Sequence, residues 1–290
     1  MIDGKTNLVG VIGMPIEHTL SPIIHNAAFE KLGLNWCYLP LPVFSENIKD
    51  GIQGLVALGF RGVNVTAPHK QAVIPYLDQV DPETQELGAV NTLVMSREDN
   101  KTPYLTGYNT DVAGFLTPLI KNGFDPKDKK VVIIGSGGSA SAVIFGLLSK
   151  DVKEIKLLNR SLERINRLKE KNFINNHRIN IDLLNTDTLI ESVRWADLLV
   201  NTTPVGTFPK IQDSIWPDKI PVPSHLTVYD LVYNPLETKL LRQARQSKAF
   251  PIGGLDMLIC QAALSFEMWT GLMPPIDIMK IKAHEYFSRR

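Results

Sequence analysis

The segment VVIIGSGGSASAVIFGLLSK, residues 131–150, restricts the fold of this chain more than any other feature of its sequence. An uninterrupted apolar run is followed directly by a glycine turn and then by a helical pattern, an order typical of parallel α/β sheets. Gly135, Gly137 and Ala140 have the G-x-G-x-x-A spacing. The first glycine permits a tight turn, the second lets the backbone approach a ligand, and the small third residue lets the helix pack closely on the sheet. We therefore expect at least one open α/β sheet.

The same turn predicts a nucleotide-binding site. A helix that starts at such a loop directs its N–H groups and the positive end of its dipole toward phosphate groups. About 20 residues further along, where this arrangement selects its cofactor, the next strand ends in Asn159, Arg160 and Ser161. No acid is present there to bind the ribose 2′-OH of NAD, whereas Arg160 and Arg164 can pair with the 2′-phosphate of NADP. We therefore predict NADP as the cofactor; the alternative is that both arginines are solvated residues at a helix start.

Strand and helix patterns alternate along the rest of the chain as well. The polar stretch 121–130 separates two series. In the first series we expect strands at 7–13, 36–43, 62–66, 92–96 and 104–109, and helices at 21–33 and 47–59. In the second we expect strand–turn–helix units at 130–150 and 154–171, further units within 195–206 and 226–246, and helices from 255 onward. The alternation indicates an α/β fold with parallel crossovers in both halves.

The composition limits the class of protein. The 31 Lys and Arg residues balance 30 Asp and Glu residues, and the net charge of +1 argues against nucleic acid or an anionic membrane as the main partner. Cys37 and Cys260 are far apart and outside any pairing motif, which fits a reducing compartment and argues against a disulfide framework or a zinc site. The sequence has no leader-like N-terminus and no apolar run of about 18 residues, so we expect a soluble cytoplasmic protein.

A single lysine, Lys70, ends the segment GVNVTAPHK, residues 62–70, just past Thr66 and Pro68. Open α/β sheets hold their ligands at the carboxyl ends of the strands, and Pro68 would stiffen the loop by fixing φ. A lysine that is fixed by rigid neighbours can supply a cation and a transferable proton. Spacing alone leaves the alternative of a solvated surface lysine open.

Nine short segments of the chain together resemble the shikimate dehydrogenase family. They are EHTLSPIIHN (17–26), GVNVTAPHK (62–70), GAVNTL (88–93), GYNTD (107–111), GSGGSA (135–140), LLNRS (157–161), VNTTPVG (200–206), YDLVYNP (229–235) and GGLDMLICQAA (253–263). They occur in the family's order and cover essentially the whole chain, so the resemblance is specific. It implies reversible, NADPH-dependent reduction of the 3-keto group of 3-dehydroshikimate to shikimate, a step in aromatic amino-acid (chorismate) biosynthesis.

The resemblance also implies two domains. Residues 1–111 together with 255–290 would form the substrate-binding catalytic domain, an α/β domain with a mixed, mostly parallel sheet. Residues 112–254 would form the Rossmann domain that binds NADP. The C-terminal helices would return to the first domain, and the expected oligomeric state is a monomer or a homodimer.

The family's functional residues fall on matching positions of this chain. Lys70 and Asp111 fall on the catalytic pair. The substrate-contacting positions are Thr19, Ser21, Thr66, Asn91, Tyr233 and Gln261. The cofactor positions are Gly135, Ser136, Gly137, Gly138, Ser139, Ala140, Asn159, Arg160, Ser161, Arg164, Asn201, Thr203 and Gly254. Hydride addition puts negative charge on the ketone oxygen, so Lys70 can give it a proton while Asp111 orients the lysine and holds it charged. No metal is implied.

Thr19 is the departure from the family pattern that bears most on function. The family commonly has Ser-x-Ser where this chain has Thr19 and Ser21, and the extra methyl would lie beside the substrate carboxylate or its C1 substituent. A quinate/shikimate dehydrogenase that uses NAD or NADP is therefore kept as an alternative. A catalytically silent NADP-binding sensor is a second alternative, against which the presence of both Lys70 and Asp111 counts.

Several polar residues near these motifs also have a purely structural interpretation. His18, His25 and His69 do not have the spacing of a metal-binding set, so we expect them to pack or to cap. Asn91 could be an ordinary turn residue, because Asn stabilises turns through local hydrogen bonds. Tyr233 precedes Asn-Pro and could pack at the end of a strand.

Overall fold

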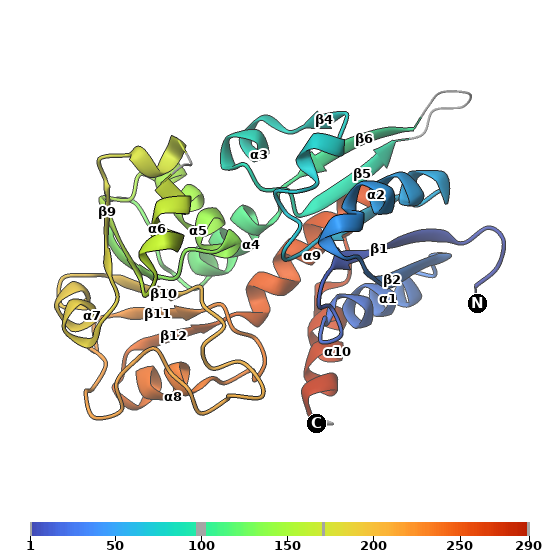
Figure 1. Cartoon of the computed structure of the whole chain (residues 1–290). Helices are drawn as coiled ribbons and strands as arrows, with labels where there is room; N and C mark the ends of the chain where they lie inside the picture. The colour runs from blue at the N-terminus through green and yellow to red at the C-terminus, as the bar shows by residue number, and fades with distance from the viewer. Residues whose placement is uncertain (1, 97–102, 170–171, 289–290) are drawn as a thin grey trace. The chain divides into compact units, whose positions relative to one another are not determined.

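The computed structural model describes residues 2–96, 103–169 and 172–288, and the chain divides into two compact units. Unit 1 comprises residues 1–110 and 261–290, and unit 2 comprises residues 111–260. Each unit contains its own sheet (Figure 1). The α/β class expected from the sequence is confirmed. The domain boundaries expected at 111/112 and 254/255 remain a prediction.

Unit 1 contains a mixed sheet. Its strands are β1 (Asn7–Gly13), β2 (Trp36–Pro42), β3 (Gly62–Val65), β4 (Gln79–Val80), β5 (Thr92–Ser96) and β6 (Tyr104–Tyr108). They lie in the order β2-β1-β3-β5-β6-β4. β1 pairs in parallel with β2 and β3, and β4 with β6, whereas β5 is antiparallel to both of its neighbours. Because β1 and β3 are central, most of their residues are buried, as the near-continuous apolar runs predict.

Helices cover both faces of this sheet. They are α1 (Ser21–Lys31), α2 (Ile48–Ala57), α3 (Pro82–Leu87), α9 (Leu255–Thr270) and α10 (Ile276–Ser288), and α9 starts in unit 2 and ends in unit 1. On one face, Ile52 and Leu55 of α2 pack in a cluster with Val63 and Val65 of β3. Side chains alternate along a strand, so Asn64, between these valines, points to the opposite face.

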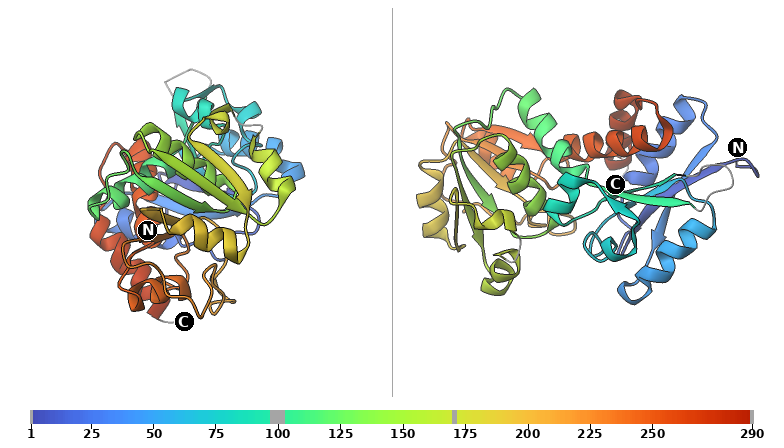
Figure 2. Two further views of the ribbon diagram at one scale, coloured as in Figure 1. Left: turned by 90° about the vertical axis from the view of Figure 1, so that its left-hand side faces the viewer. Right: turned by 90° about the horizontal axis from the view of Figure 1, so that it is seen from above.

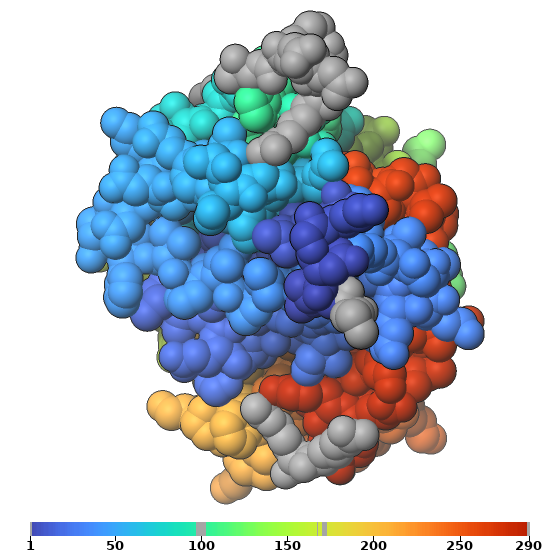
Figure 3. All heavy atoms as spheres, turned by 90° about the vertical axis from the view of Figure 1, so that its right-hand side faces the viewer, coloured from blue at the N-terminus to red at the C-terminus, as the bar shows by residue number. Residues whose placement is uncertain are grey.

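Aromatic side chains fill that opposite face. The His25 ring of α1 stacks on Tyr38 of β2 with a centroid distance of 4.4 Å, and its centroid lies 6.2 Å from that of Phe266 and 5.5 Å from that of Trp269. Trp269 Nε1 donates to the carbonyl oxygen of Leu93 at 3.0 Å, which joins α9 to β5. The red C-terminal segment lies against the blue N-terminal segment in both Figure 2 and Figure 3, where α10 packs on α1. Residues from the two ends of the chain therefore share one core.

Unit 2 contains a sheet in which all strands are parallel. They are β7 (Lys130–Ile134), β8 (Glu154–Asn159), β9 (Ile179–Leu183), β10 (Leu198–Asn201), β11 (Thr227–Asp230) and β12 (Phe250–Gly253). Their order, β12-β11-β10-β7-β8-β9, is the 3-2-1-4-5-6 order of a dinucleotide-binding Rossmann domain read from the other edge. In such sheets ligands bind at the carboxyl ends of the strands, where the order reverses between β7 and β10.

The helices of unit 2 also lie on both faces of their sheet. They are α4 (Asp111–Lys121), α5 (Gly138–Ser149), α6 (Leu162–Lys169), α7 (Thr186–Val193) and α8 (Lys239–Gln246). Val132 and Ile134 of β7 share a core cluster with Leu189 of α7 and Leu240 of α8. The opposite face is covered by α4 and α5, which pack against each other at Gly146 of α5.

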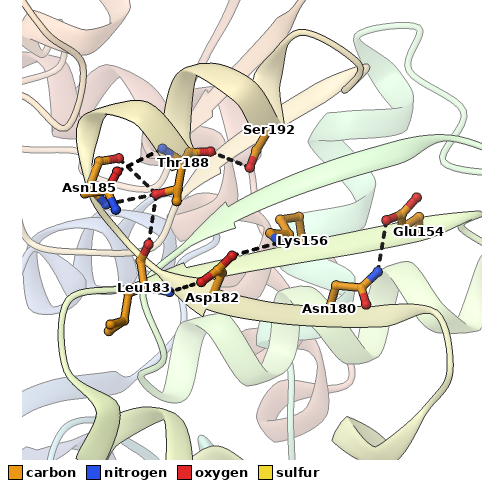
Figure 4. Close-up of polar contacts among 8 residues, drawn as sticks. All are labelled: Glu154, Lys156, Asn180, Asp182, Leu183, Asn185, Thr188 and Ser192. Carbon is orange, nitrogen blue, oxygen red and sulfur yellow. Dashed lines mark hydrogen bonds and ion pairs between the residues drawn. The ribbon is translucent and has the colours of Figure 1, made fainter.

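The strand β9 and the helix α7 were not predicted from the sequence, because β9 is a partly exposed edge strand without an apolar run. Polar contacts hold both in place (Figure 4). Asp182 of β9 forms an ion pair with Lys156 of β8 at 3.2 Å, and Asn180 donates to Glu154 at 3.0 Å. The side chain of Asn185 accepts from the backbone N–H of Thr188 in a capping box that starts α7.

The remaining expectations differ from the structure mainly at their ends. The helix expected at 21–33 ends at Lys31, where Leu32 caps it and Gly33 takes a φ of 66°. The connection between the strands expected at 92–96 and 104–109 falls largely on residues 97–102, which lie outside the described residues. Within the described ranges, no helix combines the length and the apolar character needed to cross a membrane.

Candidate active site

The glycine loop of unit 2 joins β7 to α5. Gly135 has a φ of 110°, and a Cβ there would lie 2.5 Å from Thr202 Oγ1 and 3.0 Å from Thr203 Cγ2, so only glycine fits. Gly137 is the N-cap of α5, and a Cβ at that position would meet no atom within 4 Å. The loop therefore opens onto free space at the N-terminus of a long helix, where the backbone N–H groups of Gly138, Ser139 and Ala140 begin the first turn. This arrangement favours an anion.

Asn159 holds the end of β8 against this loop. It is buried, and its Nδ2 donates to Ser136 Oγ at 2.9 Å and to the carbonyl oxygen of Ser161 at 3.3 Å. Ser161 Oγ accepts from the backbone N–H of Arg164 at 3.3 Å, which caps the start of α6. Arg160 and Arg164 are exposed, so both guanidinium groups are available to an anionic ligand.

A pocket of about 800 Å³ lies at the carboxyl ends of four neighbouring strands of unit 2. Its walls include Ile134, Arg160, Leu184 and Thr203, together with Lys239 and most of the segment 204–218. Contacts with α8 hold this segment in place: Asp218 pairs with Lys239 at 2.7 Å, and Ser214 donates to Gln243 at 2.6 Å. Arg160 thus lines a cavity at the carboxyl ends of the strands, where this fold binds nucleotides.

Asp230, at the end of β11, supports the pocket wall from behind. Burial raises the pKa of Asp230 to about 6, against the opposing effect of its hydrogen bonds. Its carboxylate accepts from Asn201 Nδ2 at 2.9 Å and from Thr238 Oγ1 at 2.6 Å. Asn201 Oδ1 in turn accepts from both the backbone N–H and the hydroxyl of Thr203, at 3.0 and 2.7 Å. Asp230 therefore orients Asn201, and Asn201 orients Thr203 at the pocket.

Sequence reasoning assigned no role to Asp230, although an acid directly after a buried apolar strand was a signal that could have been followed. Gly254 was predicted to lie near the cofactor. A Cβ there would overlap the Leu231 carbonyl group and lie 2.9 Å from the Val232 carbonyl oxygen, so packing alone requires a glycine. Tyr233 is half-buried in the segment after β11.

In unit 1, hydrogen bonds fix the loop that carries Lys70. His69 is fully buried, its Nε2 lies 2.7 Å from the carbonyl oxygen of Val43, and its backbone N–H donates to the carbonyl oxygen of Thr66 at 2.9 Å. The carbonyl oxygen of Lys70 accepts from the backbone N–H of Val90 at 2.8 Å. The backbone of Lys70 is thus held on both sides, and the Lys70 side chain is half-buried.

Asn91, which follows Val90, joins this loop to Thr110, the last residue of this segment of unit 1. Asn91 is buried; its Oδ1 accepts from the backbone N–H of Thr110 at 2.8 Å, and its Nδ2 donates to Thr110 Oγ1 at 3.0 Å. Asp111 comes next in the chain as the first residue of α4, and it too is buried. The bonds of Val90 and Asn91 therefore bring together the backbone of Lys70, the Asn91 side chain and the residue that precedes Asp111. Asn91 is more than an ordinary turn residue.

The other predicted substrate residues of unit 1 surround the ends of the central strands. Ser21 is the first residue of α1, and Thr19 Oγ1 lies 3.3 Å from Ser21 Oγ. Thr66 follows β3, and its backbone N–H donates to the carbonyl oxygen of Ile12 at 2.9 Å. A methyl group on Gly13 would overlap the Thr66 side chain, so the end of β1 closely contacts Thr66. Gln261 is half-buried on α9.

His25 has a structural environment. Its ring is fully buried among aromatic rings, and neither of its ring nitrogens has a hydrogen-bond partner among the described residues. Burial lowers the pKa of His25 to about 3. The ring is therefore neutral and packs in the core, as expected for a histidine outside a metal site.

Comparisons with known proteins cover both units. Three family models match the chain. Residues 11–93 match the shikimate dehydrogenase substrate binding domain, and residues 119–212 match shikimate / quinate 5-dehydrogenase. Residues 254–280 match the shikimate 5'-dehydrogenase C-terminal domain. The shikimate dehydrogenase (NADP(+)) of Methanopyrus kandleri is 42% identical over 284 residues, which cover 96% of this chain and 95% of the relative. A crystal structure of a shikimate dehydrogenase in complex with NADP+ is 39% identical with a TM-score of 0.89, covering 99% of this chain and 98% of the other. A quinate dehydrogenase from Corynebacterium glutamicum, in complex with NAD, is 29% identical with a TM-score of 0.86, covering 97% and 99%.

Proposed function

The chain belongs to the shikimate dehydrogenase family, and we propose that it catalyses the reversible NADPH-dependent reduction of 3-dehydroshikimate to shikimate, with Lys70 and Asp111 as its catalytic pair. The observation that carries the activity is the identity of 42% over nearly the full length of an NADP-dependent shikimate dehydrogenase. This reaction makes the protein an oxidoreductase of aromatic amino-acid biosynthesis that acts on a CH–OH group. The proposal includes a cytoplasmic location and a monomeric or homodimeric state, and light scattering after size exclusion measures the latter.

The residues of unit 2 fit NADP. The open space beside Gly137 can accept the pyrophosphate at the N-terminus of α5, and Gly135 allows the turn that creates this space. Arg160, beside the pocket, and Arg164 can hold the 2′-phosphate, because guanidinium groups pair bidentately with phosphate oxygens. Bound NADPH supplies the hydride.

The chain's own contribution to the chemistry is a proton and a fixed geometry. As negative charge develops on the 3-keto oxygen, the Lys70 ammonium donates a proton to it, and in the reverse direction the neutral amine accepts that proton from the 3-hydroxyl. Asp111 orients Lys70 in this proposal. The bonds at Val90 and Thr110 support this assignment, because they hold Lys70 to Val90 and hold Thr110, the residue before Asp111, to the adjacent Asn91.

Short polar side chains recognise the substrate in this proposal. Thr19 and Ser21 bind the carboxylate, and Thr66, Asn91 and Gln261 bind the hydroxyl groups, with Tyr233 as a further contact. Hydrogen bonds of this kind reject analogues that lack a partner group more strongly than apolar contacts do.

Replacement of Lys70 by alanine tests the catalytic pair. Lys70→Ala is expected to lower kcat by roughly 10²–10⁴-fold, because general-acid assistance is lost. The dissociation constant of NADP, measured by calorimetry, should stay within about twofold of the wild-type value, since an uncharged side chain in unit 1 does not alter the glycine loop. Lys49→Ala, an exposed lysine of α2, is the matched control and should leave both quantities unchanged. If Lys70→Ala keeps kcat within about tenfold of wild type, the assigned role is wrong.

A quinate/shikimate dehydrogenase is the second candidate, because Thr19 departs from the family pattern and the quinate dehydrogenase matches the whole fold. Steady-state kinetics with shikimate and quinate, each with NADP and with NAD, separate the candidates. We expect the highest kcat/KM for shikimate with NADP. Dominant NAD-linked turnover of quinate would replace our proposal by the second candidate.

A further inference from the structure

Four buried polar side chains meet in the core of unit 1. They are Tyr38 of β2, Asn64 of β3, Thr92 of β5 and Ser265 of α9, none more than 7% exposed, and together they form what we call the amide cluster. Tyr38 donates its hydroxyl hydrogen to Asn64 Oδ1 at 2.8 Å. Asn64 Nδ2 donates to Ser265 Oγ at 2.9 Å and to Thr92 Oγ1 at 3.2 Å, and these two hydroxyl oxygens are 2.8 Å apart. Asn64 is thus the centre of the cluster.

The orientation of the Asn64 amide is fixed by its partners. Its Nδ2 also lies 3.2 Å from the backbone carbonyl oxygen of Asn91, which can only accept a hydrogen bond. The amide nitrogen must therefore face Asn91, and the amide oxygen must face Tyr38. Burial raises the pKa of Tyr38 above its usual range, so Tyr38 remains a protonated donor at any working pH.

Each of the three residues around Asn64 hydrogen-bonds to a residue that we propose to bind substrate. The Ser21 hydroxyl donates to the Tyr38 hydroxyl oxygen, since Tyr38 gives its own hydrogen to Asn64. Thr92 Oγ1 donates to Asn91 Oδ1 at 3.0 Å, the same oxygen that accepts from the backbone N–H of Thr110 before Asp111. On α9, Ser265 Oγ donates to the carbonyl oxygen of Gln261 at 3.2 Å, one helical turn away. Three segments distant in sequence are thus joined through one amide.

Stability alone does not explain an asparagine at this position. Asn64 lies between Val63 and Val65 in a strand that is buried throughout, where a matched apolar core can be as stable as a hydrogen-bonded polar one. Apolar side chains, however, form no directional hydrogen bonds that could orient neighbouring groups. A fully satisfied buried network fixes a single arrangement of the groups that it joins.

We propose that Asn64 is a positioning residue, which through Tyr38, Thr92 and Ser265 sets the relative placement of Ser21, Asn91 and Gln261 for recognition of the hydroxylated carboxylate substrate. This inference rests on the proposed function. It goes beyond it by assigning the ordering of the substrate site to residues that do not touch the substrate.

Two variants test the inference. Asn64→Leu removes the centre of the cluster, and Tyr38→Phe removes a single hydroxyl without changing the ring that stacks on His25. We expect the dissociation constant and KM of shikimate to rise about tenfold or more in each, the factor that corresponds to one well-placed hydrogen bond. The dissociation constant of NADP should stay within about twofold, because the glycine loop and the pocket belong to unit 2. Tyr104→Phe is the matched control, since Tyr104 is exposed and its hydroxyl donates to Gln79, which lies outside the cluster.

The outcomes are distinct. If the variants fold, as judged by circular dichroism, and bind shikimate within twofold of wild type, the inference is wrong while the proposed function stands. A parallel rise in the dissociation constants of shikimate and NADP indicates general loosening and also overturns it. If Asn64→Leu does not fold, Tyr38→Phe decides. Wild-type protein that fails to bind shikimate in the calorimeter would overturn the proposed function and this inference together.

Discussion

The two sheets of this protein hold their polar groups in different places. In unit 2, the strand β7 is fully buried and apolar from Val131 to Ile134, and the polar residues Asn159, Asn201 and Asp230 lie only at the carboxyl ends of strands. In unit 1, Tyr38 and Asn64 lie within strands, inside the core. Unit 2 therefore presents backbone groups and strand ends to its ligand, whereas unit 1 depends on oriented side chains that reach deep into its interior.

The difference predicts two kinds of sensitivity to substitution. A site made from backbone is limited by the φ angle and by the space next to each Cα, so glycines are its critical residues. A site made from buried amides and hydroxyls is limited by the direction of its hydrogen bonds, so changes that preserve shape can still disable it. The variants below test whether this contrast holds.

The largest effect is expected in the glycine loop. Gly135→Ala should weaken NADP binding by at least about 100-fold and lower the free energy of unfolding, because a Cβ at a φ of 110° overlaps Thr202 and Thr203. Gly137→Ala should weaken NADP binding by about tenfold or more but change the free energy of unfolding by less than about 0.5 kcal/mol, since its Cβ enters free space. Calorimetry and urea unfolding measure the two quantities. Equal loss of stability in both variants would contradict the backbone account of unit 2.

A smaller effect is expected at Arg160. Arg160→Met should raise the KM of NADP about tenfold, because a charge-assisted pair with the 2′-phosphate is lost, and should leave the KM of NAD nearly unchanged. Steady-state kinetics with both cofactors measure the ratio. Arg194→Met, an exposed arginine at the end of α7, is the control. If the KM values of NADP and NAD rise together, Arg160 does not bind the 2′-phosphate of NADP.

The remaining effects concern the pH dependence of stability, and they should differ in sign between the units. The pKa of His25 is about 3 in the folded chain and 6.5 ordinarily, so acidification below pH 6.5 protonates only the unfolded state and removes stability until about pH 3. Between about pH 7 and pH 5 the loss should be about 2 kcal/mol, and His25→Phe should abolish it. Urea unfolding at both pH values, assigned to each unit by amide hydrogen exchange, measures the change. An unaltered acid response in His25→Phe would show that the ring is not the titrating group.

In unit 2, the buried carboxyl group of Asp230 should raise the stability of the fold as the pH falls, opposite to the effect of His25. Its pKa is raised from 3.8 to about 6, so the stability that it contributes is fully present below pH 3.8 and is lost as the pH rises through 6. Between pH 7 and pH 5, the free energy of unfolding should therefore fall by about 1 kcal/mol more in Asp230→Asn than in the wild type. A shallower loss in this variant would contradict the raised pKa.

The sequence predicts well those features that short segments carry. The strand–glycine–helix unit at 131–150, the strands at 7–13 and 62–66, and the class of the fold follow from local periodicity and turn chemistry, and the structure confirms them. The edge strand β9 escaped prediction because edge strands are short and partly exposed, so they lack an apolar run.

The hydrogen-bond partners of the supporting residues were beyond local reasoning for a different reason. Asn64 lies inside the motif GVNVTAPHK and received no role, since its partners Tyr38 and Ser265 are 26 and 201 positions away. Asp230 and Asn201 are 29 positions apart and belong to different strands. Such pairings exist only once the sheets have formed, whereas residues that act at strand ends, such as Lys70 and Arg160, can be predicted from their place in the sequence.

Because of the helix α9, unit 1 can be completed only after unit 2 has been synthesised. Its first residues belong to unit 2, but Ser265 and Trp269, which bond to Asn64 and Leu93 in unit 1, are translated only after all of unit 2. While the ribosome is still making residues 111–260, the core of unit 1 lacks one side of its aromatic face, and the Asn64 amide lacks one of its partners. Unit 2 can complete its sheet during that interval, because its strands are contiguous in the chain. A chain that ends within α9 just after Cys260 would thus retain a complete unit 2 and an unfinished unit 1.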